Sequence, residues 1–390
     1  MKSWSGCGSS GILNDRMKYY IIAGEASGDL HASDLMRGLH AVDPACEIRF
    51  WGGDAMAAEG GTLVRHYRDT AVMGIVEILG KAPRILRNLA FCKKDLLAWK
   101  PDAVILVDYP GFNLKIARFA HDRGLKVFYY IAPKVWAHKA WRIKNLRRDV
   151  DALYCIFPFE LGWFRKHGVE PRYFGNPLSD RIARTQFRPL EEGSAPRRRI
   201  ALLAGSRQAE LRFLMPRFAA LEKLLAADPQ LSEYKLTVAG APSLGPDDYR
   251  GYLPEGSKIE VLFGRTYDIL AASQAAVISS GTASLEAALI GTPQIVCYGF
   301  NQLTWLIARL TVKVPYVSLA NLILGRPLLP ELLQSQASPE AIFQELKSIL
   351  TDTGTRSRMQ TGYTELRRTL GQSGSSERTA KDIYETIARI

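Results

Sequence analysis

Paired cysteines and long apolar runs are missing from this sequence, and their absence excludes several classes of protein. The five cysteines are scattered and form no CxxC pair, which excludes a disulfide scaffold and fits a reducing cytoplasm. The six histidines show no metal-ligand spacing, so we expect no metal site. No run of 18 uncharged apolar residues occurs, so no segment is predicted to span a bilayer. Residues 1–16 also lack the apolar core of a signal peptide, and we expect a disordered extension there, with Met17 as a candidate start.

What is present is a long globular chain with a basic surplus. At 390 residues, 47% of them hydrophobic and 23% charged, it has the size of two domains and enough apolar residues for two cores. Its formal net charge is +12, which favours an anionic partner such as nucleic acid, an acidic membrane face or a phosphorylated substrate. The charge alone does not choose among these three.

Short apolar, β-rich runs alternate with helical patterns along both halves of the chain. Such runs are typical of parallel strands buried on both faces, and the helices between them complete βαβ units. We therefore predict the α/β class, with two Rossmann-like doubly wound domains and an interdomain cleft as the ligand site. The predicted strands are Tyr19–Ala23, Ile48–Trp51, Ala103–Val107, Val127–Ile131, Leu153–Ile156, Ile200–Ala204, Leu236–Ala239, Ile259–Phe263, Ala276–Ser279 and Gln294–Cys297.

A polar stretch with two prolines, residues 178–199, reads as the linker between the halves. It divides the chain into an N-terminal domain over 17–185 and a C-terminal domain over 190–372. Helices predicted over 356–370 and 376–390 close the chain.

The first predicted strand ends in a glycine-rich turn, GEASGD over residues 24–29, that carries the carboxylate of Glu25. The spacing fits neither GxGxxG nor GxxxxGK, so neither a dinucleotide cofactor nor a P-loop is indicated, and we expect no cofactor. Amides at the start of the next helix can receive an anion. A capped turn with Asp29 as N-cap is the alternative, although packing does not require Glu25 there.

Asp108 follows the apolar strand Ala103–Val107 and opens a Pro-Gly turn. Open α/β sheets bind their ligands at the carboxyl ends of buried strands. A partly buried carboxylate at that position can act as a general base. Simple capping of the turn is the alternative.

Two turns of the second half each combine a strand end, a glycine and a helix start. The first adds a guanidinium, which is a planar partner for phosphate oxygens. The second adds a glutamate one helical turn later, suited to ribose hydroxyls while the helix start takes a diphosphate. Each alone reads as an ordinary turn, but together they favour a nucleotide-sugar site. Its candidate residues are Gly205, Ser206, Arg207, Gly281, Thr282 and Glu286.

Residues 71–79 carry more apolar side chains than one face of a surface helix needs. The surplus predicts a patch for acyl chains or a bilayer interface, and a helix buried on two sides is the alternative. The predicted lipid contacts are Val72, Met73, Ile75, Val76 and Leu79.

Two other segments have competing interpretations. Asp149-Val150-Asp151 matches the DxD of metal-dependent glycosyltransferases, but a three-residue match before a strand is best taken as coincidence. The basic and aromatic segment 134–148 can contact anionic headgroups or nucleic acid. A solvated charged helix with half-buried Trp136 and Trp141 is its alternative.

Seven separated blocks, taken together and in order, resemble the lipid-A-disaccharide synthases, a glycosyltransferase family of the GT-B type. They are GEASGD, AVMGIVEILG, VDYPGFN, YIAPKVWAH, AGSRQAE, SSGTASLE and YVSLANLILGR. The resemblance runs from about Tyr19 to about Leu333. The GT-B type also implies that residues 373–390 pack back on the N-terminal domain.

The resemblance implies an enzyme that joins UDP-2,3-diacylglucosamine to 2,3-diacylglucosamine 1-phosphate with inversion and without a metal. The products are UDP and a β-1,6-linked disaccharide 1-phosphate. The N-terminal domain takes the lipid acceptor and the C-terminal domain the UDP-sugar, at the inner face of the cytoplasmic membrane. The implied residues are Asp108 as catalytic base, Glu25 as a second acidic position, and Arg207, Glu286 and Asn321 on the UDP side. Gly111 stands where some members carry another carboxylate, so no pair of acids is expected within that block.

Two other functions remain as hypotheses. A non-hydrolysing UDP-sugar 2-epimerase shares the two domains and the UDP site, but has no use for an apolar patch at 71–79. A nucleic-acid-binding protein using segment 134–148 requires a steep salt dependence, and we do not expect a nucleic-acid partner. The sequence leaves open the acyl-chain length, the ligands of the acceptor phosphate, and the oligomeric state, a homodimer included.

Overall fold

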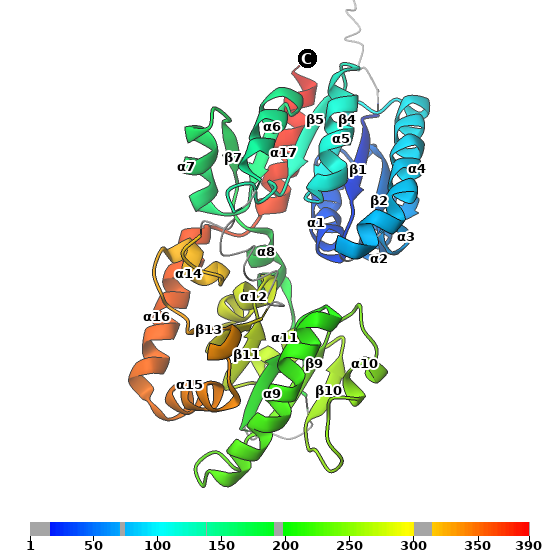
Figure 1. The fold of residues 1–390 in the computed structure, drawn as a ribbon. Coiled ribbons are helices and arrows are strands. Elements are labelled where there is room, and N and C mark those ends of the chain that lie inside the picture. Colours follow the sequence, from blue (N-terminus) through cyan, green and yellow to red (C-terminus); the bar gives the residue numbers. More distant parts are fainter. Residues whose placement is uncertain (1–15, 71–74, 138, 191–197, 300–313, 390) are drawn as a thin grey trace, which may run out of the picture.

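The computed structural model describes residues 16–70, 75–137, 139–190, 198–299 and 314–389. They form two lobes, each built on one parallel sheet (Figure 1). The predicted α/β class with two Rossmann-like sheets is therefore confirmed. The extension predicted over residues 1–16 lies, apart from Arg16, outside the described residues.

The first sheet has seven strands in the order β3-β2-β1-β4-β5-β6-β7. Its strands are β1 (Lys18–Ala23), β2 (Glu47–Gly52), β3 (Thr62–His66), β4 (Ala103–Val107), β5 (Lys126–Tyr130), β6 (Ala152–Cys155) and β7 (Pro171–Tyr173). Alternate residues of β1 enter different cores, Tyr19 and Ile21 on one face and Tyr20 and Ile22 on the other. Because both faces are covered, the interior strand β4 (AVILV) is an uninterrupted, fully buried apolar run.

The helices of this lobe fill the crossovers between its strands. They are α1 (Ala26–Val42), α2 (Asp54–Ala58), α3 (Tyr67–Thr70), α4 (Ile75–Trp99), α5 (Pro110–His121), the 3-10 turn η1 (Ala140–Arg142), α6 (Ile143–Asp149), α7 (Pro158–Lys166) and α8 (Pro177–Arg184).

The second sheet has six strands in the order β10-β9-β8-β11-β12-β13, the same winding as in the first lobe. Its strands are β8 (Arg199–Leu203), β9 (Lys235–Gly240), β10 (Glu260–Phe263), β11 (Ala275–Ser279), β12 (Gln294–Tyr298) and β13 (Glu331–Leu333). Its helices are α9 (Gln208–Ala227), α10 (Pro246–Arg250), α11 (Thr266–Ala271), α12 (Thr282–Ile290), α14 (Leu319–Leu324), the 3-10 turn η2 (Gln334–Gln336), α15 (Pro339–Thr351) and α16 (Thr353–Leu370).

The segment predicted as a linker over 178–199 begins instead as a helix, α8. Asn176 caps it by accepting a hydrogen bond from the Leu178 amide at 2.9 Å, and donates its own amide to Ile156 O at 2.9 Å. Leu178 and Ile182 are buried. The polar, charged sequence hid this helix because only one narrow face of it is apolar.

The last helix, α17 (Ser375–Ala388), belongs to the first lobe although the second lobe precedes it in the chain (Figure 1, red helix). It packs so closely on α1 that a Cβ added to Gly38 would lie 2.9 Å from the Cβ of Ala380. The Tyr154 hydroxyl of β6 donates to Asp382 at 2.8 Å. Because α17 covers α1 and bonds to the sheet, the chain connects the two lobes twice.

Candidate functional site

Asp108 lies at the carboxyl end of β4, where its amide donates to Tyr130 O of β5 at 3.1 Å. Both Asp108 and Tyr109 have left-handed backbones, with φ of 43° and 49°. Non-glycine residues in this region cost of order 1–3 kcal/mol each and persist only where their surroundings hold them. Here the carbonyl of Asp108 accepts from the Tyr129 hydroxyl at 2.6 Å and from the Asn113 amide at 2.8 Å. These two hydrogen bonds hold the backbone of Asp108 and so fix the direction in which its side chain leaves the turn.

Asn113 is a functional residue that the sequence analysis left without a role. It is fully buried, and its side-chain amide also donates to Val107 O at 3.2 Å and Ile22 O at 3.3 Å. It therefore ties the ends of β1 and β4 to the Asp108 turn. Its signal in the sequence was a polar residue one turn inside a helix whose neighbours are apolar.

Glu25 follows β1, which is paired with β4, so the structure brings the two predicted acids to the same edge of the sheet. Glu25 is the exposed N-cap residue of α1, and among the described residues no side chain caps that helix. Gly24 is required because a Cβ at that position would overlap the ring of Tyr109. Burial raises the pKa of Asp108 to about 6, Lys134 lowers it, and Glu25 raises it. A carboxyl group with this pKa is mostly ionised at neutral pH and can accept a proton.

Asp29 is not the N-cap of α1, which was the alternative reading of this turn. It lies buried in the first turn of α1 and accepts from the amides of Gly53 at 2.7 Å, Ala55 at 3.1 Å and Met56 at 3.1 Å. Its carboxylate thus caps the N-terminal amides of α2. Because the Asp29 carboxylate accepts hydrogen bonds from α2, it does not cap α1. The first amides of α1, next to Glu25, have no side-chain cap among the described residues.

The 205–207 turn of the second lobe differs from the sequence prediction in one respect. Glu210, one turn into α9, accepts from the amides of Ser206 at 2.8 Å and Arg207 at 3.3 Å. These two amides are therefore not free for an anion. The guanidinium of Arg207 lies 3.5 Å from the Glu210 carboxylate, but it is 64% exposed and so stays accessible to a ligand. Gly205 has φ 97°, and a Cβ there would overlap the Glu210 carboxylate. A glutamate three residues after the N-cap was the sequence signal for this arrangement.

The Gly281 turn leads directly into α12. Gly281 has φ 143°, Thr282 is the first helical residue, and among the described residues no side chain caps this helix start. Glu286, half-buried one turn later, accepts from the Tyr267 hydroxyl at 2.7 Å, and burial raises its pKa. The start of α12, unlike that of α9, keeps its first amides without a side-chain partner among the described residues.

Asn321 is not free to contact a nucleotide through its side chain. It is fully buried, donates to Leu329 O at 3.0 Å and Glu331 at 2.8 Å, and accepts from the amides of Leu328 at 2.9 Å and Leu329 at 2.8 Å. All of its hydrogen-bonding capacity is used inside the lobe. In this structure its side chain positions the loop before β13, and its place on the UDP side stays a prediction.

The two lobes meet at α8, which packs on both α1 and α12, and Arg181 of this helix acts on charged groups of both lobes. Its guanidinium donates to Asp34 at 2.7 Å and Leu30 O at 2.6 Å, both on α1. The same guanidinium lowers the pKa of Glu286 on α12, against the dominant effect of burial. Glu286 is therefore electrostatically linked to the lobe that carries Asp108.

The remaining predicted segments are placed as follows. Asp149 is buried against Arg148 at 2.6 Å, and Asp151 accepts from the Val127 amide at 2.8 Å at the amino end of β6, as expected for a coincidental DxD. Trp141 is 63% exposed, whereas Trp136 donates to buried Glu160 at 2.9 Å. Val72 and Met73 lie outside the described residues, and Ile75, Val76 and Leu79 fall in the first turns of α4.

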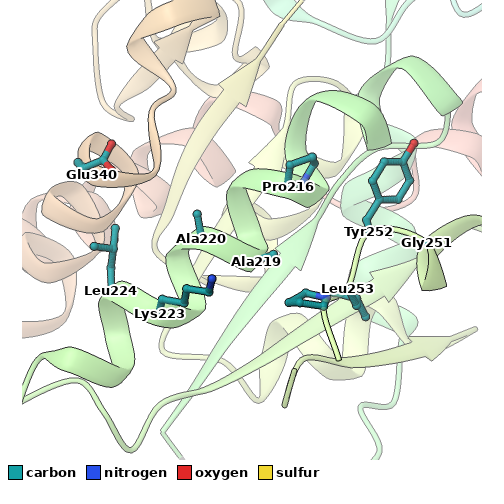
Figure 2. Close-up of a pocket in the computed structure, with 10 residues that line it drawn as sticks. Pro216, Ala219, Ala220, Lys223, Leu224, Gly251, Tyr252, Leu253 and Glu340 are labelled. Atoms are coloured by element: carbon teal, nitrogen blue, oxygen red, sulfur yellow. The ribbon is translucent and has the colours of Figure 1, made fainter. Parts of the chain in front are cut away.

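A pocket of about 580 Å³ lies on the outer face of the second lobe (Figure 2). One face of α9, from Pro216 to Leu224, forms its floor, and residues 251–254 and Glu340 form its sides. None of the predicted site residues lines it. This pocket is therefore not the interdomain cleft expected from the sequence.

Comparison with known proteins gives one consistent result. The family model described as lipid-A-disaccharide synthetase matches residues 19–385. The lipid-A-disaccharide synthase of Myxococcus xanthus is 38% identical over 374 residues, covering 94% of this chain and 97% of that protein. That of Syntrophus aciditrophicus is 38% identical over 371 residues, covering 92% and 95%.

Solved structures are similar in fold at low identity. The UDP-GlcNAc 2-epimerase of Neisseria meningitidis aligns with a TM-score of 0.63 at 9% identity, covering 96% of this chain and all of that one. The glycosyltransferase SnogD of Streptomyces nogalater aligns with a TM-score of 0.53 at 16% identity, covering 95% of this chain and all of that one. These likenesses show a shared two-lobed architecture alone, so they do not choose between epimerase and glycosyltransferase.

Proposed function

Because this chain belongs to the lipid-A-disaccharide synthetase family, we propose that it joins UDP-2,3-diacylglucosamine to 2,3-diacylglucosamine 1-phosphate, with Asp108 as the general base. It is a hexosyltransferase of lipid A disaccharide synthesis. The observation that carries the proposed mechanism is the fixed turn at the end of β4, which holds one partly buried carboxyl group with a pKa of about 6.

Asp108 accepts the proton of the acceptor 6-hydroxyl as that oxygen attacks the anomeric carbon of the donor. Attack from the face opposite UDP inverts the anomeric centre, so one base suffices and no covalent intermediate forms. Burial is the main cause of the raised pKa of Asp108, and the negative charge of Glu25 adds to it because it disfavours ionisation. We assign Glu25 to this tuning role.

The departing UDP gains negative charge, which the second lobe stabilises. Arg207 offers a guanidinium, and the uncapped start of α12 at Gly281 and Thr282 offers backbone amides. Glu286, oriented by Tyr267, accepts from the ribose hydroxyls. Gly205 and Ser206 shape the turn that presents Arg207.

Contact with the membrane is the third part of the proposal. Within the described residues no helix combines the length and apolar character needed to cross a bilayer. The apolar segment that contains Val72, Met73, Ile75, Val76 and Leu79 is proposed to rest on the inner face of the cytoplasmic membrane and admit acyl chains. Exposed Leu86 and Phe91 further along α4 support an apolar surface there. Replacing Val72, Ile75 and Leu79 by Ser should reduce sedimentation with liposomes, and the same change at exposed Phe187 serves as the control.

The test of the reaction is UDP release from the purified protein. We expect UDP only when the diacylated UDP-sugar and the monosaccharide phosphate are both present. Release at the level of a blank would end the proposal. Conversion of the UDP-sugar without any acceptor would favour an epimerase instead.

A further inference from the structure

The loop that follows β5 brings two cations to the Asp108 turn. β4 and β5 are paired at Val107 and Tyr130, and the amide of Asp108 bonds to Tyr130 O. Lys134 comes four residues after that partner and is exposed. Arg142 follows in η1, on the same connection between β5 and α6. The connection therefore leaves the sheet at the edge that holds the proposed base.

These two cations differ from most arginines around them in having no carboxylate neighbour. Arg118 and Arg148 of the same lobe contact Asp149, at 3.4 and 2.6 Å, and Arg181 contacts Asp34 at 2.7 Å. Within the described residues, no carboxylate oxygen lies within 4.0 Å of the charged nitrogens of Lys134 or Arg142. Lys134 is exposed, and the guanidinium of half-buried Arg142 lies 5.6 Å from the ring centroid of Trp141. Because no carboxylate of the described residues neutralises them, both charges are available to an external anion.

Neighbouring groups report the positive potential of this loop. Burial raises the pKa of Asp108 and Lys134 lowers it. His31 on α1 has its pKa lowered to about 4 by burial and by Arg181, with Asp34 opposing and Lys134 adding to the decrease. Burial and Asp108 raise the pKa of Tyr129, and Arg142 lowers it. The positive potential is thus felt on the α1 side, on the β5 side and at the base itself.

We propose that Lys134, with Arg142 as second cation, binds the phosphate group of the acceptor sugar and so sets its hydroxyl against Asp108. The inference rests on the proposed function, because that function supplies an acceptor with a phosphate monoester. The 1-phosphate and the 6-hydroxyl belong to the two ring carbons on either side of the ring oxygen, so a phosphate held beside the base brings the 6-hydroxyl of the same hexose close to Asp108. The loop then selects a phosphorylated acceptor over a neutral one.

The decisive experiment compares two acceptors, diacylglucosamine 1-phosphate and diacylglucosamine, in detergent micelles without anionic lipid. For the wild type, kcat/KM falls when the phosphate is missing. Lys134→Gln should lower kcat/KM for the phosphorylated acceptor about tenfold to a hundredfold, the range expected for one lost charged hydrogen bond. It should change kcat/KM for the neutral acceptor by less than about twofold, and leave the KM for the UDP-sugar unchanged. Lys134→Arg should restore most of the discrimination.

The matched control is Lys144→Gln, an exposed cation on α6 in the same basic segment, which should leave both acceptors unaffected. An equal loss with both acceptors, together with a shifted pH profile, would show that Lys134 acts only on Asp108 and would overturn the inference. Unchanged kinetics with weaker binding to anionic vesicles would assign Lys134 to lipid headgroups and would overturn it as well. A wild type without any UDP release would instead remove the proposed function, so the two failures are distinguishable.

Discussion

The two lobes share one winding but build their strand-end turns differently. In the first lobe the turn after β4 uses Asp108 and Tyr109 in left-handed conformations that only surrounding hydrogen bonds maintain. In the two candidate-site turns of the second lobe the positive-φ positions are glycines, Gly205 and Gly281, which adopt them without strain. The first lobe therefore stores strain where a side chain must be aimed. The second lobe keeps relaxed turns, and the one at Gly281 leaves the first amides of α12 without a side-chain cap.

Because of this difference, we expect substitutions in the strand-end turns of the two lobes to change different kinetic constants. Damage to the first turn should affect kcat, because it moves or removes the base. Damage to the second should affect the KM for the donor, because it changes how UDP is held.

The largest effect is expected for Asp108→Asn. Removal of a general base typically costs about a hundredfold to ten-thousandfold in rate, so kcat should fall by at least about a hundredfold. UDP affinity, measured by calorimetry, should stay within about twofold because the second lobe is untouched. Asp122→Asn, at the far end of α5, is the control and should keep full activity. Turnover within a few-fold of wild type would reject Asp108 as the base.

The next largest effect is on pH dependence. With a pKa of about 6 for Asp108, kcat/KM should fall about tenfold per pH unit below that value, because the protonated carboxyl cannot accept a proton. Glu25→Gln removes the neighbouring charge that raises this pKa, so the acidic limb should move to lower pH. A limb that stays at the same pH in Glu25→Gln would show that the titrating group is not Asp108.

Two glycine substitutions should divide between the kinetic constants. Gly24→Ala drives a methyl group into the Tyr109 ring and should lower kcat about tenfold. Gly205→Ala collides with Glu210 at φ 97° and should raise the donor KM by a similar factor. The added methyl group of Gly111→Ala would meet no atom within 4 Å, and this position needs no left-handed backbone. The kcat and KM of this variant, measured by steady-state kinetics, should therefore equal those of the wild type. Equal effects of both substitutions on kcat and KM would break the comparison between lobes.

The smallest effect is expected for Tyr267→Phe. Losing one hydrogen bond to Glu286 should raise the donor KM about two- to fivefold with kcat unchanged. The purified variant should unfold at nearly the wild-type temperature. A lower kcat at the same KM would place Tyr267 on the path of the reaction instead.

The interior strands could be predicted because burial on both faces leaves a plain apolar run, as in β4 and β11. The strands β3, β7 and β13 could not, since each lies at a sheet edge and is short or half-exposed. Helix α8 was missed for a related reason: its apolar face is narrow and its contacts lie on helices distant in sequence. The spacing of hydrophobic residues shows which face of a segment is buried. It does not show which distant segments pack against that face.

For the candidate site, topology alone brought Glu25 and Asp108 to one edge, because parallel strands end together. What side chains do there depends on contacts that spacing does not encode. Asn321 forms its hydrogen bonds with the loop before β13. Glu210 accepts from amides that the sequence suggested were free. The role proposed for Lys134 depends on its position near the Asp108 turn. Their residue types were visible, but their partners were not.

The position of α17 bears on how the protein is made. The surface of α1 that receives it, around Gly38, is synthesised first, whereas α17 leaves the ribosome last. The first lobe therefore cannot be completed, and the face of α1 that packs on α17 stays uncovered, until the whole second lobe has been translated. Contacts between such distant segments form slowly and leave the chain open to aggregation in the meantime. A message that ends even a few codons before Ser375 would thus yield a finished second lobe attached to a first lobe that has no means of closing.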